Sequence, residues 1–149
     1  EGLFYLITTE YQDGDGRDSN HLYTLDAKTG EEKWKVETLL VEDSSPIVSE
    51  GMVYFGSHDF HIYALDMKTG KEEWLYETDG MLLTSPIVYK GIVYFECDNK
   101  HLYALDAKTG EYKWAYKTGT RRSRNKSTIA SEGLVYVCHE VGIWAIDIE

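Results

Sequence analysis

Apolar and polar residues alternate along short stretches of the chain, and one such stretch recurs at a fixed distance. In His61–Thr78, which reads HIYALDMKTGKEEWLYET, Tyr63 and Leu65 fall on one face of an extended chain, and Ile62 and Ala64 fall on the other. This period of two is typical of a strand whose two faces meet different surroundings. A turn-forming segment, DMKTG, follows, and the chain is then extended again and rich in aromatic residues. The stretch therefore predicts a β-hairpin.

The hairpin belongs to a longer repeat. Copies of it at residues 21–38 and 101–118 lie 40 residues to either side, and a truncated copy, GIWAID, lies at residues 142–147. Two further segments, SPIV and GMVYF, precede the hairpin and recur with it, which gives units of four predicted strands, A to D. The chain then holds three, four, four and three strands in approximate units 1–38, 39–78, 79–118 and 119–149. We expect these units to form a single repeat region over residues 1–149.

Antiparallel units of four strands and about 40–45 residues are typical of a β-propeller, in which each unit buries its faces against its neighbours. A β-sandwich is the alternative, but a sandwich gives no reason for one turn to repeat at constant spacing. The sequence therefore predicts an all-β chain of about four propeller blades, the first and last incomplete. We expect it to be part of a larger or shared propeller.

The hairpin also carries a recognisable motif. Ala64, Asp66, Thr69, Gly70 and Trp74 follow the pattern Ala-x-Asp-x-x-Thr-Gly-x-x-x-Trp, which recurs in full 40 residues later and with Thr in place of Ala 40 residues earlier. This pattern resembles the tryptophan-docking motif of the pyrroloquinoline-quinone-like (PQQ-like) propeller repeat. The resemblance implies that the motif tryptophans stack between adjacent blades as structural residues: Trp34, Trp74 and Trp114.

The resemblance implies two classes of function. PQQ-dependent quinoprotein dehydrogenases have eight blades, a Ca²⁺ site, a catalytic Asp and often a disulfide between neighbouring cysteines, and this sequence has no Cys-Cys pair. Similar repeats also occur in non-enzymatic scaffolds, such as an outer-membrane assembly lipoprotein and luminal stress sensors. We therefore expect a non-catalytic binding or scaffolding module without PQQ or calcium. A fragment or subunit of a quinoprotein dehydrogenase is the alternative.

Charge and hydropathy limit the classes of binding partner that we expect for this chain. The net charge of −11 argues against a nucleic-acid or anionic-lipid binder, because phosphates attract clustered Lys and Arg. No apolar run approaches the length of a membrane span. We expect a protein partner or self-association. Relatives of the repeat often work outside the cytoplasm, which implies a periplasmic, secreted or cell-surface location.

The copies diverge mainly in the loops that follow strands B and D, which a meandering blade places on one face. Loops on a rigid scaffold often carry function. The first B–C loop has an insertion around residues 11–20, and its alternating carboxylates resemble a calcium loop: Asp13, Asp15 and Asp18. Arg17 interrupts that pattern, which favours a plain polar hairpin over a metal site.

The last D–A loop contains the basic run of this acidic chain: Arg121, Arg122, Arg124 and Lys126. Such runs are usually solvated, but Arg also favours carboxylates and phosphates. These residues are the candidates for binding a protein partner or a small anionic ligand.

The remaining candidate ligands are histidines and cysteines. His58 and His61 lie on one hairpin, but two donors without a third make a weak metal site. Cys97 and Cys138 fall one position out of register in successive units, which turns their side chains to opposite sheet faces. This favours two free thiols over a disulfide.

Overall fold

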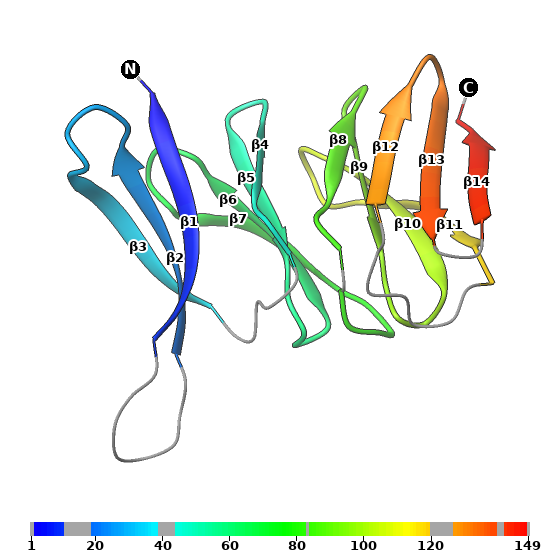
Figure 1. Cartoon of the computed structure of the whole chain (residues 1–149), viewed down its shortest axis with the longest axis horizontal. Helices are drawn as coiled ribbons and strands as arrows, with labels where there is room; N and C mark the ends of the chain where they lie inside the picture. Colours follow the sequence, from blue (N-terminus) through cyan, green and yellow to red (C-terminus); the bar gives the residue numbers. More distant parts are fainter. Residues whose placement is uncertain are drawn as a thin grey trace.

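The computed structural model describes residues 2–10, 19–38, 44–82, 84–119, 127–139 and 142–148. These residues form 14 strands; there is no helix among them, and so none long and apolar enough to cross a membrane. Neighbouring strands pair antiparallel in four separate sheets of three, four, four and three strands, which follow one another in chain order from left to right in Figure 1. The predicted all-β propeller architecture, with incomplete first and last blades, is confirmed.

The four sheets are numbered in chain order. The first contains β1 (Leu3–Glu10), β2 (Ser19–Asp26) and β3 (Glu32–Thr38). The second contains β4 (Ile47–Ser49), β5 (Met52–Gly56), β6 (His61–Asp66) and β7 (Glu72–Glu77). The third contains β8 (Ile87–Tyr89), β9 (Ile92–Glu96), β10 (His101–Asp106) and β11 (Tyr112–Lys117). The fourth contains β12 (Ser127–Ser131), β13 (Leu134–His139) and β14 (Gly142–Asp147).

Two of the A strands are shorter than the SPIV pattern predicts. β4 begins at Ile47 and β8 at Ile87, so Pro46 and Pro86 lie just outside the ladders. Proline has no N–H to donate to a neighbouring strand, which explains the late start.

The A–B turns are two-residue hairpins of the kind the polar-Gly pairs predict. Ser49 pairs with Met52, and the two residues between them have positive φ angles, 51° at Glu50 and 85° at Gly51. Positive φ angles at the equivalent two residues recur in the third and fourth sheets. Two successive left-handed residues define a type I′ turn, whose twist matches that of the flanking strands.

The two faces of a blade contribute to different cores. On β6, Ile62 and Ala64 belong to an apolar cluster shared with the third sheet. Leu65, on the opposite face, belongs to a cluster shared with the first sheet. All three side chains are buried, because the second sheet is covered on both sides. The period of two in this stretch therefore separates two buried faces rather than a buried and a wet one.

Strand order sets the positions of the loops. The A strand β8 contacts the A strands β4 and β12 of the two neighbouring blades. The A–B turns lie at the upper end of the sheets in Figure 1, and the B–C hairpins β5–β6 and β9–β10 close at the lower end. We call this lower end, with the B–C hairpins and the D–A connections, the loop face.

Candidate functional site

Two of the motif tryptophans, Trp34 and Trp74, reach from one blade to the C–D turn of the next. The Trp34 indole Nε1 donates a hydrogen bond of 3.2 Å to the Met67 carbonyl, and the Trp74 Nε1 donates one of 3.0 Å to the Ala107 carbonyl. A Cβ on Gly70 would stand 2.7 Å from the Trp34 ring. Each ring therefore covers the motif glycine of the following blade, at a distance that leaves no room for a side chain there.

In the first and second blades, a tyrosine on the B strand binds the same carbonyl as the tryptophan. Tyr5 donates to the Met67 carbonyl at 3.1 Å, and the buried Tyr54 donates to the Ala107 carbonyl at 2.9 Å. Burial, followed by the negative charges of Glu50 and Asp106, raises the pKa of Tyr54 to about 12. Sequence analysis missed this contact. Its signal is a Tyr three residues after the turn glycine in every copy.

The motif aspartates hold their own turns. In each turn one carboxylate oxygen accepts hydrogen bonds from the backbone N–H groups two and three residues later, as Asp66 does from Lys68 and Thr69. The Thr69 hydroxyl also donates to Asp66, and these hydrogen bonds, the Thr69 hydroxyl first, lower the Asp66 pKa. Asp26 and Asp106 accept equivalent backbone bonds. The three carboxylates are thus engaged as turn caps.

The loop face is braced by contacts between connections and hairpins. Thr78, at the end of the second blade, donates from its backbone N–H and its hydroxyl to the Phe60 carbonyl, at 2.7 and 2.9 Å. Met81 and Asp98 exchange two hydrogen bonds of 3.0 Å between the D–A connection and the next B–C hairpin. The hairpins are therefore held in place by the connections beside them.

Phe60 is an exposed aromatic residue of this face. Its side chain is 46% exposed and its φ of 71° is left-handed, an unusual conformation for a bulky residue. Its counterpart in the next hairpin, Lys100, has a φ of 72°. The backbone therefore has the same left-handed conformation at this position in the second and third blades. Of these two hairpins, that of the second blade has an aromatic ring there and that of the third has a lysine. Sequence analysis did not single out Phe60.

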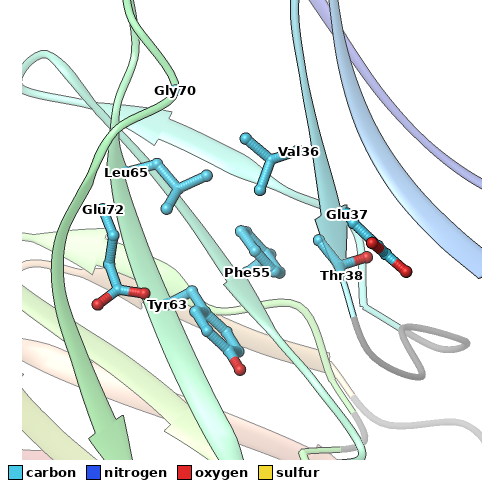
Figure 2. A pocket seen from close by; sticks show the side chains of 8 residues that line it. All are labelled: Val36, Glu37, Thr38, Phe55, Tyr63, Leu65, Gly70 and Glu72. Carbon is cyan, nitrogen blue, oxygen red and sulfur yellow. The ribbon is translucent and has the colours of Figure 1, made fainter.

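A cavity of about 260 Å³ lies between the first and second sheets (Figure 2). Phe55 and Tyr63 stack in its wall, with ring centroids 5.1 Å apart and planes 7° from parallel. In Figure 2, Val36 from the first sheet is directed toward Leu65 and Phe55 of the second. The lining residues are Val36, Glu37, Thr38, Phe55, Tyr63, Leu65, Gly70 and Glu72. No feature of the sequence singled this cavity out.

Asp59 organises the hairpin beside this cavity. Its Oδ2 accepts a hydrogen bond of 2.7 Å from the Tyr63 hydroxyl, and its Oδ1 accepts one of 3.1 Å from the His61 backbone N–H. Burial, the hydrogen bond to Asp59 and the charges of Asp59 and Glu72 raise the Tyr63 pKa. In the third blade Asn99 takes the place of Asp59 and donates to Tyr103 at 2.6 Å. The second blade therefore carries a carboxylate at a position where the third is neutral.

The predicted ligand residues fall largely outside the described part of the chain. This applies to the calcium candidates Asp13, Asp15 and Asp18 and to the basic run Arg121, Arg122, Arg124 and Lys126. Within the described residues, no group of three or more His, Cys, Asp or Glu side chains could hold a metal ion. Cys97 is buried, Cys138 is partly exposed, and no disulfide joins them.

A buried acid also escaped sequence analysis. The Glu96 side chain is fully buried at the loop-face end of β9, where its Oε1 accepts a hydrogen bond of 3.3 Å from the Thr118 hydroxyl. The equivalent residue in the second blade is Gly56, and a Cβ on Gly56 would stand 2.6 Å from Leu82. The two blades therefore fill this end of strand B differently.

Four-stranded meandering sheets, joined by tryptophans that reach the next blade's turn, define a β-propeller of PQQ-like repeats. The chain belongs to the family whose model is described as outer membrane protein assembly factor BamB, and the match extends over residues 11–149. No curated protein matches the sequence.

Solved structures show the same fold. BamB from Moraxella catarrhalis is similar with a TM-score of 0.70 and 23% identity, over 96% of this chain and 47% of that one. The quinohemoprotein alcohol dehydrogenase of Comamonas testosteroni is similar with a TM-score of 0.57 and 24% identity, over 66% and 19%. Sqt1 of Saccharomyces cerevisiae has a TM-score of 0.70 at 12% identity, over 89% and 41%. The chain thus spans about half the length of the BamB structure.

Proposed function

We propose that this chain is part of a non-catalytic propeller scaffold that binds a protein partner through its loop face. The single observation that carries the proposal is Phe60, a 46% exposed aromatic ring in a left-handed backbone position that two hydrogen bonds from Thr78 brace. Aromatic anchors on a rigid support are the residues that dominate protein interfaces. The family description names an outer membrane assembly factor, which supports a protein partner in that assembly and a location outside the cytoplasm.

The proposal is tested by site-specific photocrosslinking in the native host. A photoreactive residue at position 60 is expected to give a discrete adduct with one partner protein. The control position is Leu75 on β7, whose side chain is also 46% exposed but lies on a D strand away from the loop face. Adducts from position 75 and none from position 60 would place the binding surface elsewhere.

Matched substitutions make the test more specific, because each variant takes the residue that a neighbouring blade has at the equivalent position. Phe60→Lys copies Lys100 of the next blade, and Leu75→Lys copies Lys35 of the preceding one. We expect Phe60→Lys to weaken partner binding by at least about tenfold, as loss of an anchor does. Leu75→Lys is expected to leave binding unchanged. Equal losses in both variants would contradict the assignment of the face.

The alternative, a fragment of a quinoprotein dehydrogenase, rests on similarity of fold. One assay can contradict the scaffold proposal: it supplies the chain with PQQ, Ca²⁺, an artificial electron acceptor and alcohols or sugars as substrates. The scaffold proposal expects no turnover that depends on the added quinone. Quinone-dependent turnover of the chain would overturn the proposal.

A further inference from the structure

The cavity between the first two blades is the size of a single ring or side chain. Its volume of about 260 Å³ falls below the roughly 300–1,000 Å³ typical of clefts for drug-sized ligands. Phe55 and Leu65 form a buried apolar wall, and the Tyr63 ring stacks on Phe55. A flat group could therefore lie against an aromatic surface that is already rigid.

The interface between the second and third sheets has residues equivalent to those that line the cavity. Each of the eight lining residues has a counterpart 40 residues later, and six of the eight are the same residue type. The two exceptions are Val36, replaced by Tyr76, and Glu72, replaced by Tyr112. In the second interface the Tyr76 and Tyr112 rings stack, with centroids 6.4 Å apart and planes at 14°. The first interface therefore lacks two stacked phenol rings that its neighbour has.

The charge at the cavity is negative. Glu72 is exposed where its counterpart is a tyrosine, and in Figure 2 its carboxylate lies on the Tyr63 side of the cavity. The Asp59 carboxylate binds the Tyr63 hydroxyl from beyond the wall. The described lining residues include no Lys or Arg. A ligand that fits both the aromatic wall and this field carries a positive charge.

From the vacant ring positions, the aromatic wall and the Glu72 carboxylate, we propose that this cavity binds a small flat cation. The chemistry is an aryl-alkyl ammonium or a guanidinium group, with its flat face on the partly exposed Tyr63 ring, which stacks on the buried Phe55, and its charge toward Glu72. Such a group has two sources, a free aromatic amine or the arginine side chain of a protein. This site lies between blades, and it is independent of the partner binding proposed for the loop face.

Titration with three probes tests the chemistry, read by chemical shifts of the whole chain. Tyramine carries a ring and an ammonium group, 4-ethylphenol is its neutral analogue, and N-acetylarginine amide presents a guanidinium group. Tyramine is expected to bind with a dissociation constant of about 1 mM, as befits its size, and 4-ethylphenol at least tenfold more weakly. Tighter binding of the arginine probe than of tyramine would assign the site to a protein side chain, and the reverse to a free amine.

Two variants test the location. Glu72→Gln removes only the charge of an exposed side chain, and should weaken the cationic probes by about two- to fivefold while leaving 4-ethylphenol unchanged. The double variant Val36→Tyr, Glu72→Tyr copies the second interface, so it should abolish binding of every probe without lowering the thermal midpoint. Glu32→Gln is the matched control, because Glu32 is the counterpart of Glu72 on the first blade and does not line the cavity.

The outcomes decide the proposal in either direction. Weakened tyramine binding in Glu72→Gln and its loss in the double variant, with Glu32→Gln unchanged, support it. Unaltered tyramine binding in the filled double variant would overturn the location. Equal binding of tyramine and 4-ethylphenol would overturn the cationic ligand. Where the double variant fails to fold, the Glu72→Gln variant still tests the site, because unchanged tyramine binding in it would overturn the proposed role of the Glu72 charge.

Discussion

The Trp74 indole lies so close to Gly110 of the next blade that a Cβ on Gly110 would stand 2.8 Å from the ring. Real Cβ atoms do not approach a ring this closely, so one of the two groups would have to move. The glycine thus has two roles. Its φ of +73° satisfies the turn, and its missing side chain admits the tryptophan.

The two roles of the glycine can be measured separately. Gly30 has the same φ of +73°, but no atom lies within 4 Å of the point that a Cβ would occupy there. Gly30→Ala should destabilise by about 1–2 kcal/mol, the cost of a left-handed alanine. Gly110→Ala should cost a further ~1–3 kcal/mol, because the Trp74 ring is displaced. Denaturant unfolding of both variants provides the measurement, and equal losses would show that the ring contact contributes nothing.

Trp74 itself is expected to be among the most sensitive core positions. Its side chain is 9% exposed, packs against Tyr54 at a centroid distance of 5.9 Å and binds the Ala107 carbonyl. Trp74→Ala should lower the free energy of unfolding by about 3–5 kcal/mol. Leu75→Ala, at the exposed neighbouring position, should change it by no more than about 0.5 kcal/mol. A loss for Trp74→Ala as small as that of the control would refute its packing between blades.

Tyr54 predicts a loss of stability at alkaline pH. Its pKa is raised from about 10 in the unfolded chain to about 12 in the fold, where the neutral hydroxyl donates to the Ala107 carbonyl. The folded chain therefore holds its proton more tightly. The stabilisation is complete below pH ~10 and is lost as the pH rises through ~12.

The Tyr54→Phe variant isolates this effect. It should lose about 1 kcal/mol at neutral pH, the worth of the hydrogen bond. Between pH ~10 and ~12 its unfolding free energy should fall less steeply than that of the native chain. Urea unfolding across this range checks the prediction, and parallel curves for the two proteins would contradict it.

The basic run predicts how the partner binds. Reversing the charge at Arg121, Arg122 and Arg124 should abolish binding to the natural partner and leave the thermal midpoint nearly unchanged, because these residues lie outside the repeat motif. In the native chain, binding should weaken with added salt.

The control for the arginines uses the C–D turns, which lie at the end of the blades opposite the loop face. Lys28, Lys68 and Lys108 occupy equivalent positions in the three C–D turns. Their charge reversal should leave the partner bound. Loss of binding in this lysine variant together with retention in the arginine variant would show that the partner uses the end of the blades that carries the C–D turns.

The strands and hairpins could be predicted from the sequence because their causes are local. Alternation sets which residues share a face, and glycine with a capping aspartate sets each turn. The repeat of 40 residues then predicts that successive blades have the same order of strands and turns. The predicted strands were too long at the starts of β4 and β8, where proline withholds the N–H that a ladder requires.

The sequence by itself determined the blade, its turns and the recurrence of both, since these depend on residues that are neighbours in the chain. Only the tertiary structure decided what each blade meets. Trp74 finds its carbonyl on Ala107, 33 residues later, and Val36 lines the same cavity as Glu72 of the next sheet. Such contacts depend on how one sheet packs against the next, and the local alternation of residues does not specify which residues of two sheets come together. The sites between blades were therefore visible only after the sheets were stacked.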